Sequence, residues 1–402
     1  MATPADLSQR LRELPAIAPL LGALERMPEA RLVGGAVRDL LLGGDPLDLD
    51  VVVAGDPGAF ALTLANVVGG ELQVHDRFGT ATVTADGRSY DVVRARAESY
   101  AQPGALPDVR PGTLAEDLAR RDFTVNAIAL GLDGRLDAVD GALDDLAARR
   151  LRVLHDASFS DDPTRLLRLV RYATRLGFEV ESHTAELMRG ALADGVFRTV
   201  TATRIGAELR LLLREPAAQE ALAWVAGWSG GDALVNGLSF DRALAQRALA
   251  LLPEDGRADL LLLAVAAHRV EPQALAVWLS ALGFTARERD TVVAAVGGAA
   301  RVAARLGEGR RLEPSEVAAA LRGAPPELAA LAGALDAEAE PAVRDWLERL
   351  RHVRLEIDGD DLIAAGIPQG EALGRALAAA LDAKLDGRTA GEADELAVAL
   401  SA

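Results

Sequence analysis

The chain has 402 residues, half of them hydrophobic, with no cysteine and a formal net charge of −17. This length predicts two to four domains with apolar cores, and the lack of cysteine excludes a disulfide framework and any thiolate metal site. No apolar run reaches membrane-spanning length and no hydrophobic leader follows the charged start, so we expect a cytoplasmic protein without a membrane partner.

The negative charge argues against a nucleic-acid partner, because phosphate binding depends on cations. The charge is unevenly distributed along the chain, however, and the segment 149–214 holds 12 arginines and 8 acidic residues. A basic segment is therefore still available for a polyanion.

The periodicity of apolar residues changes near Ala142. Before it, short β-like segments alternate with helical ones and glycine turns, which predicts an α+β domain. After it, apolar residues recur at helical spacing to the end of the chain. Turn residues at 229–232, 306–309 and 323–326 predict breaks between helical domains. The predicted strands are Arg31–Val33, Leu47–Val53, Thr80–Thr84 and Ser89–Arg94.

The glycine pair Gly34-Gly35 follows the first predicted strand and opens a helix. Backbone N–H groups at such a turn suit phosphate oxygens, although a plain tight turn is the commoner reason for two glycines. Asp48 and Asp50 stand at i and i+2 in the next strand, so alternation predicts that they share one face. Neighbouring carboxylates are stable together when a cation lies between them, and oxygen donors favour Mg²⁺. We therefore expect phosphoryl or nucleotidyl transfer, with a solvated strand edge as the alternative.

Two further segments add polar side chains. Asp91 could supply a third carboxylate or be a surface residue. In the run Arg120-Arg121-Asp122 to Asn126, Asp122 and Asn126 are four residues apart and are predicted to share a helix face. These side chains could bind ribose hydroxyls while the arginines pair with phosphate. The alternative is an N-terminal cap by Asp122 on an ordinary amphipathic helix.

The third segment is Asp161-Asp162-Pro163-Thr164-Arg165, which continues to Arg168. An acid before proline is typical of a helix start. Asp162 and Arg165 together present acceptors and donors, as hydrogen bonding to a nucleobase edge requires. An ion pair on a solvated helix face is the alternative.

With these segments in this order, the chain resembles the class II tRNA nucleotidyltransferases of the poly(A) polymerase head-domain family, within the DNA polymerase β superfamily. The strong similarity covers roughly residues 30–215. Weaker matches are the segments 204–209 and 357–366. The resemblance implies an α+β catalytic head with a small mixed sheet (1–142), followed by an all-α neck (143–215), body (216–325) and tail (326–402).

The family motifs imply a role for each candidate residue. Asp48 and Asp50 would bind two Mg²⁺ ions, and Asp91 would support catalysis. Asp122 and Asn126 would select ribose, and Asp162 with Arg165 would act as a template for the incoming base. The remaining nucleotide-binding residues would be Gly34, Gly35, Arg38, Arg120, Arg121 and Arg168. The implied substrates are ATP and possibly CTP, and the implied partner is tRNA, held by its 3′ end and upper half.

The sequence departs from the family pattern at two positions, and the resemblance leaves more than one function open. Family members commonly have Glu at the positions of Asp161 and Asp91. The segment from Ala95 to Thr113 is not shortened, whereas family members that add only CC have a shortened segment at this place. Its sequence is more similar to that of members that add A, which favours addition of A. The alternatives are a bacterial poly(A) polymerase, disfavoured by the acidic residues after Asp386, and a catalytically silent RNA-binding module, disfavoured by the intact acids.

Overall fold

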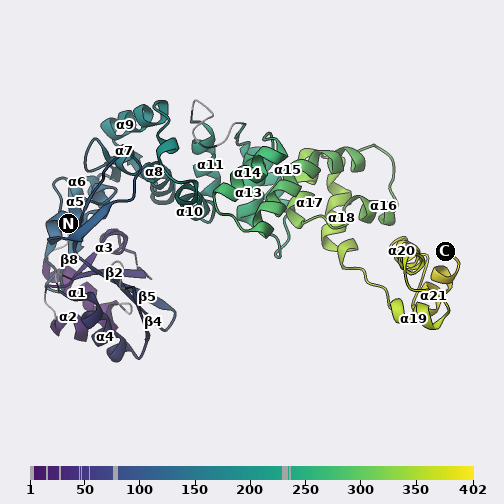
Figure 1. Ribbon diagram of the computed structural model, residues 1–402, viewed down its shortest axis with the longest axis horizontal. Coiled ribbons are helices and arrows are strands. Elements are labelled where there is room, and N and C mark those ends of the chain that lie inside the picture. Colours follow the sequence, from purple (N-terminus) through teal and green to yellow (C-terminus); the bar gives the residue numbers. More distant parts are fainter. Residues whose placement is uncertain are drawn as a thin grey trace. The chain divides into compact units, whose positions relative to one another are not determined.

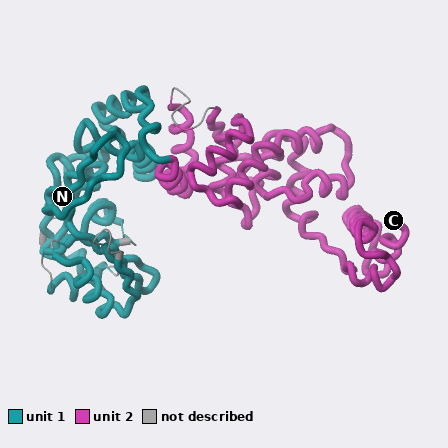
Figure 2. The backbone as a smooth tube through the Cα atoms, in the orientation of Figure 1, with its two compact units in different colours: residues 1–201 teal, residues 202–402 magenta. Residues whose placement is uncertain are grey.

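A computed structural model of the chain consists of two compact units, residues 1–201 and 202–402 (Figures 1 and 2). The structure describes residues 4–14, 17–26, 29–44, 46, 48–53, 55–75, 80–228, 234 and 237–402. Within these ranges the side chains of Pro4, Ala5, Pro19, Asp48 and His75 are outside the description. The predicted break at 229–232 also lies outside the described residues.

The first unit is built on a seven-stranded mixed sheet in the order β3-β4-β5-β2-β1-β8-β9. Only the central pair β2 and β5 is parallel, and the other neighbours in the sheet are antiparallel. The strands are β1 (Arg31–Val33), β2 (Asp48–Val53), β3 (Glu71–His75), β4 (Thr80–Ala85), β5 (Arg88–Arg94), β8 (Ile128–Leu130) and β9 (Leu136–Ala138).

Strand β2 is buried except at Asp50, among its described side chains. Asp50 is exposed, whereas Val51, Val52 and Val53 are all buried, so the sheet is covered on both faces beyond Asp50. Helix α4 (Pro57–Val68) packs against β4 and β5. Leu118 of helix α5 (Leu114–Ala119) belongs to a buried cluster with Val52 and residues of β1 and β8. This packing fixes the strand that carries the acidic residues.

The other elements of the first unit are short helices and two small strand pairs. The helices are α1 (Pro4–Glu13), α2 (Ala18–Arg26), α3 (Gly35–Leu41), α6 (Ala142–Ala147), α7 (Ser158–Asp161), α8 (Thr164–Leu176) and α9 (Ser182–Ala193), with the 3-10 helices η1 (Thr124–Asn126) and η2 (Val196–Thr199). The strand pairs are β6 (Arg96–Ser99) with β7 (Asp108–Pro111), and β10 (Arg150–Leu151) with β11 (Glu179–Val180).

The β6–β7 hairpin is held by its connecting loop. The N–H of Gly104 donates to the carbonyl of Ser160 at 2.9 Å. Gly104 has a φ of +70°, and a Cβ there would lie 2.4 Å from the carbonyl oxygen of Thr199. Only glycine combines this backbone angle with so close an approach, so the loop is seated on the segment around Thr199.

The second unit is entirely helical among its described residues. Its elements are α10 (Ala202–Leu213), α11 (Ala218–Ala226), α12 (Arg242–Leu251), α13 (Ala258–Ala266), α14 (Pro272–Ala281), α15 (Ala286–Leu306), α16 (Pro314–Ala320), α17 (Pro326–Leu335), α18 (Glu340–Glu348), η3 (Leu350–His352), α19 (Gly359–Ala364), α20 (Glu371–Leu385) and α21 (Glu392–Leu400). The last three helices share a small apolar core, and an ion pair between Lys384 and the buried Glu395 joins α20 to α21.

The predicted α+β class is confirmed, and so is the helical remainder. All four predicted strands are present and agree within one residue, except that Leu47 lies outside the described residues. Strands β10 and β11 interrupt the predicted run of helices after Ala142. The predicted breaks at 306–309 and 323–326 fall between helices. The division at 201/202 lies inside the segment predicted as neck, and the four-domain scheme stays a prediction.

The helix predicted for Asp122 to Asn126 is wrong. This segment is a single 3-10 turn, preceded by a β-bridge between Phe123 and Val153. The N–H of Thr124 donates to the carbonyl of Arg152, so this backbone hydrogen bond is made to another segment and not within a helix.

Among the described residues, no helix combines the length and the apolar character that crossing a bilayer requires.

Gly104→Ala is expected to destabilise the protein more than Gly87→Ala. Both glycines have a φ near +70°, but a Cβ at Gly87 would meet no atom within 4 Å. The backbone penalty of about 1–2 kcal/mol is thus common to both, and overpacking against Thr199 adds roughly 1–3 kcal/mol at Gly104 alone. Chemical unfolding measures the difference, and equal losses would contradict the seating of the loop.

Candidate functional site

An acidic strand face forms where β2 and β5 run in parallel. The register pairs Asp50 with Asp91, so residues in the same position of adjacent strands carry the two carboxylates. Both are exposed, and Asp91 accepts a hydrogen bond of 2.7 Å from the hydroxyl of Thr82 on β4. The backbone of Asp48 belongs to β2, whereas its side chain is outside the description.

The glycine turn lies next to this acidic face. Gly34 has a φ of +74°, which favours glycine. A Cβ at Gly34 would lie 2.7 Å from Nη1 of Arg121 and 3.6 Å from Oδ2 of Asp50. The absence of a side chain therefore brings a guanidinium and a carboxylate to the turn before helix α3.

Asp122 is the central buried charge of the site. Its side chain is 8% exposed and receives four hydrogen bonds. Oδ1 accepts from the N–H of Phe123 and from Nδ2 of Asn126, both at 2.9 Å. Oδ2 accepts from Nε and Nη2 of Arg168 at 2.9 and 2.7 Å. These four donors fill the acceptor capacity of a carboxylate.

The environment of Asp122 keeps the carboxyl group ionised. Burial by itself raises its pKa, but the charge of Arg168 and the hydrogen bonds from Asn126 and Arg168 outweigh that effect and hold the pKa at about 2. The negative charge is thus present throughout the neutral range.

Tyr172 of helix α8 gathers three arginines around its ring. The guanidinium carbons of Arg171, Arg38 and Arg168 lie 4.8, 5.1 and 5.5 Å from the ring centre, within cation–π range. Arg38 is 2% exposed and donates to Oδ1 of Asn126 at 2.5 Å. The ring therefore helps to hold positive charge beside Asp122 and Asn126.

Arg120 and Arg121 are oriented by one buried acid. Asp117, on helix α5, is fully buried and accepts from Nη2 of Arg120 at 2.7 Å and from Nη2 of Arg121 at 3.0 Å. Arg120 also pairs with Glu98 of strand β6 at 2.9 Å. Asp117 thus holds both guanidinium groups in place, and the guanidinium of Arg121 also lies beside the glycine turn.

Arg165 borders a polar cavity of about 370 Å³ whose lining includes Tyr100, Arg120, His155 and Asp161. Arg165 is 4% exposed and donates to Oγ of Ser158 at 2.7 Å and to the carbonyl of Arg120 at 2.8 Å. Burial and the charge of Arg165 lower the pKa of His155. Asp162 accepts from the N–H and the hydroxyl of Thr164, which is a capping role at the start of helix α8.

Most of the predicted site residues thus form one connected group, whereas the side-chain hydrogen bonds of Asp162 described above come only from Thr164. The turn at Gly34 joins Asp50 to Arg121, and Arg121 lies 3.5 Å from the carbonyl of Asn126. Asn126 leads to Asp122 and Arg168. Sequence reasoning missed Glu98, Asp117 and Tyr172. The spacing of Asp117 from the two arginines, i+3 and i+4, is the one local signal that could have found a missed residue.

The donor atoms on the acidic strand face fit Mg²⁺, because they are carboxylate oxygens without nitrogen or sulfur. Among the described side chains, no group of three or more metal-ligating residues is present. The side chain of Asp48 is not one of the described side chains.

Arg168→Met is expected to lower the free energy of unfolding at pH 7 by roughly 3–5 kcal/mol, because Asp122 would keep a buried charge without its cation. The folded pKa of Asp122 is depressed, so its stabilisation is present above the unfolded value near 3.9 and is lost as pH falls towards about 2. The difference in unfolding free energy between the unaltered protein and Arg168→Met should therefore shrink as the pH falls from about 3.9 to about 2. Unfolding at several pH values tests this, with the exposed Arg135→Met as control; a constant difference would contradict it.

Known proteins with similar sequences include tRNA nucleotidyltransferases. A family model of the poly(A) polymerase head domain matches residues 30–152. The CC-adding tRNA nucleotidyltransferase of Deinococcus radiodurans is 47% identical over 221 residues, which cover 54% of this chain and 58% of the relative. The A-adding tRNA nucleotidyltransferase of Geobacter sulfurreducens is 36% identical over 397 residues, or 92% of this chain and 44% of the relative. The chain thus spans about half the length of the curated relatives it matches.

The fold agrees with a solved structure over the whole chain. The Thermotoga maritima CCA-adding enzyme, solved in complex with tRNA, superposes with a TM-score of 0.78 at 28% identity, and the match covers 98% of both chains. Residues 30–152 thus match the poly(A) polymerase head domain, and the chain is similar in sequence and in fold to tRNA nucleotidyltransferases.

Proposed function

We propose that the protein adds nucleotides to the 3′ end of tRNA without a nucleic-acid template, from ATP and, if it builds the whole CCA end, from CTP, with release of pyrophosphate. The observation that carries the proposal is the connection of the Asp50–Asp91 strand face, through the glycine turn, to the arginine network around Asp122. Nucleotidyl transfer needs acids for the metal beside cations for the triphosphate, and both are present here. We expect the reaction to take place in the cytoplasm.

The acidic face would serve the reacting hydroxyl and the metal. Asp50 with Asp48 would hold two Mg²⁺, which when bound supply positive charge to the triphosphate and lower the pKa of the attacking 3′-hydroxyl. Asp91, beside Asp50 in register and oriented by Thr82, would assist this face as a third carboxylate.

The triphosphate would be bound by the glycine turn and the arginines around it. Gly34 and Gly35 leave the backbone open to phosphate oxygens, and Arg121 lies against Gly34. Asp117 keeps Arg120 and Arg121 extended before the nucleotide arrives, which reduces the entropy lost on binding.

Ribose selection would depend on Asp122 through its neighbours. Since all four acceptor positions of Asp122 are filled, we assign it to positioning rather than to a direct ribose contact. Arg168 is 28% exposed in its side chain and would contact the nucleotide itself. Asn126 and Arg38, both buried, would fix the same network from the other side.

Base selection would take place at the cavity beside Arg165. Arg165 lines the cavity together with Asp161 and with Tyr100, which follows strand β6. Asp162 is not among the lining residues, and its assignment to base selection rests on its position next to Asp161 and before helix α8. The full-length hairpin supports addition of A, whereas the Deinococcus radiodurans relative adds CC. The choice between terminal A and the whole CCA is a question for the assay.

Three tRNA transcripts, ending at the discriminator base, at C and at CC, test the proposed reaction with Mg²⁺ and with ATP or CTP alone. We expect ATP to extend the CC transcript. Extension of the shorter transcripts by CTP as well would identify whole CCA addition. Incorporation of CTP but not of ATP would identify a CC-adding enzyme. Equal extension of an unrelated RNA would identify a poly(A) polymerase. If no RNA is extended, the proposal that the protein is an enzyme is rejected.

In the same assay Asp50→Ala should lose at least about 10²–10³-fold in rate, because the acid acts on charge that develops during transfer. The exposed Asp144 of helix α6 provides the matched control, Asp144→Ala, whose rate should be unchanged. A filter-binding measurement should find tRNA affinity retained in both variants. Loss of fold in Asp50→Ala would show that this acid is structural.

Arg165→Lys is expected to reduce the preference between ATP and CTP by about 1–3 kcal/mol, since lysine keeps the charge and loses the planar pair of donors. Affinity for tRNA should change little. Arg175→Lys, the same change further along helix α8, serves as the control. Competition between labelled ATP and CTP measures the preference, and an unchanged ratio would reject base recognition by Arg165.

A further inference from the structure

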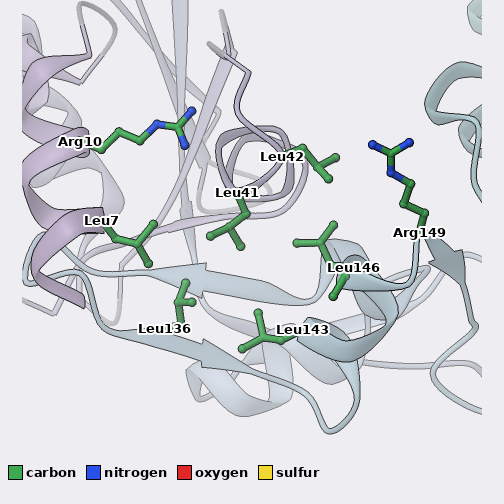
Figure 3. A pocket seen from close by; sticks show the side chains of 9 residues that line it. Leu7, Arg10, Leu41, Leu42, Leu136, Leu143, Leu146 and Arg149 are labelled. Atoms are coloured by element: carbon green, nitrogen blue, oxygen red, sulfur yellow. The ribbon is translucent and has the colours of Figure 1, made fainter. Parts of the chain in front are cut away.

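A second cavity of the first unit, of about 240 Å³, is lined mainly by leucines (Figure 3). Four elements supply them: α1, the end of α3, β9 and α6. The leucines are Leu7, Leu41, Leu42, Leu136, Leu143 and Leu146. Leu41 and Leu42 stand at the end of helix α3 opposite to Gly34, so the cavity is separated from the glycine turn by the length of that helix.

The leucine wall is only partly covered by protein. Leu42 is 42% exposed, and Leu41, Leu136 and Leu143 are half-buried. Apolar surface that converges on a concave site and is still in contact with water gains about 25 cal/mol for each Å² that a ligand covers. The cavity therefore favours an apolar ligand.

Two arginines complete the lining. In Figure 3, Arg10 extends from α1 on one side of the leucines and Arg149 from the segment after α6 on the other. Among the described residues, neither guanidinium has a carboxylate within salt-bridge distance, although acids outnumber basic residues in the chain by 60 to 43. Two positive charges beside the apolar wall thus lack a counter-charge within the described part of the protein.

Arg149 also has a strained backbone. Its φ is +52°, in the left-handed region that residues other than glycine rarely adopt. Two hydrogen bonds hold this conformation, from its N–H to the carbonyl of Leu146 and from the N–H of Glu179 to its own carbonyl. Such strain persists where the surrounding structure fixes it, and it is common at ligand sites.

The chemistry of the lining narrows the class of ligand. It contains no carboxylate, histidine or aromatic ring, so it suits neither a cation nor a stacked nucleobase. At roughly 30 Å³ per water-sized group, the volume accommodates about eight such groups. We propose that the cavity binds an amphipathic anion whose aliphatic tail of about eight carbons lies among the leucines and whose carboxylate faces Arg10 and Arg149. This site does not depend on the proposed transferase function.

Isothermal titration calorimetry of the full chain with octanoate tests the site. We expect one octanoate per chain. The affinity for octan-1-ol should be lower by about tenfold or more, because octan-1-ol lacks the charge-assisted hydrogen bonds. Acetate, which has no tail, and octylammonium, which has the opposite charge, should not bind. Equal affinity for octanoate and octan-1-ol, several octanoates per chain or no binding would overturn the proposal.

The double variant Arg10→Gln, Arg149→Gln should lose about tenfold or more in octanoate affinity and keep its weak affinity for octan-1-ol. Arg135→Gln is the matched control: Arg135 is next to Leu136 but outside the cavity lining, and its side chain is 73% exposed. An unchanged affinity in the double variant would also overturn the proposal. The comparison of ligands on the unaltered protein remains decisive if the double variant is unstable.

Discussion

The structure of the site depends on the burial of one negative charge, that of Asp122. A carboxylate removed from water is tolerated only with a cation and a full set of donors, and here the donors are Phe123, Asn126 and Arg168. Arg168 belongs to helix α8, and Asn126 belongs to the turn η1 that precedes strand β8. The carboxylate of Asp122 binds both side chains and therefore joins helix α8 to the sheet. The rest of the arginine network is arranged around that connection.

The same principle recurs at a smaller scale around the site. Asp117 is buried between Arg120 and Arg121, and Glu98 joins Arg120 to the hairpin. Each carboxylate orients a guanidinium that would otherwise sample many rotamers, so the proposed binding of a triphosphate would cost little side-chain entropy. An acidic chain can bind an anionic substrate in this way, because local pairing rather than net charge determines the field at the site.

The parts of the fold that could be predicted from the sequence are those governed by local pattern. Strand β2 follows from its apolar run, and the turn follows from the glycine pair Gly34-Gly35. The segment from Asp122 to Asn126 was predicted as a helix, yet a bridge from Phe123 to Val153, distant in sequence, makes it a 3-10 turn. Tyr172 and Glu98 were missed for the same reason. Their importance comes from partners that only the folded chain brings near, such as Arg38 at the ring of Tyr172.

The distance along the chain between Asp122 and Arg168, 46 residues, has a consequence for biosynthesis. The head-domain match ends at residue 152, before the cation of this pair has been made. A nascent chain whose emerged part ends at residue 152 would therefore hold a carboxylate that cannot be buried stably until helix α8 follows. Translation would then pass through a stage in which the strands of the sheet have emerged and Asp122 is still open to water. The segment that matches the head domain accordingly ends before the residue that completes the burial of Asp122.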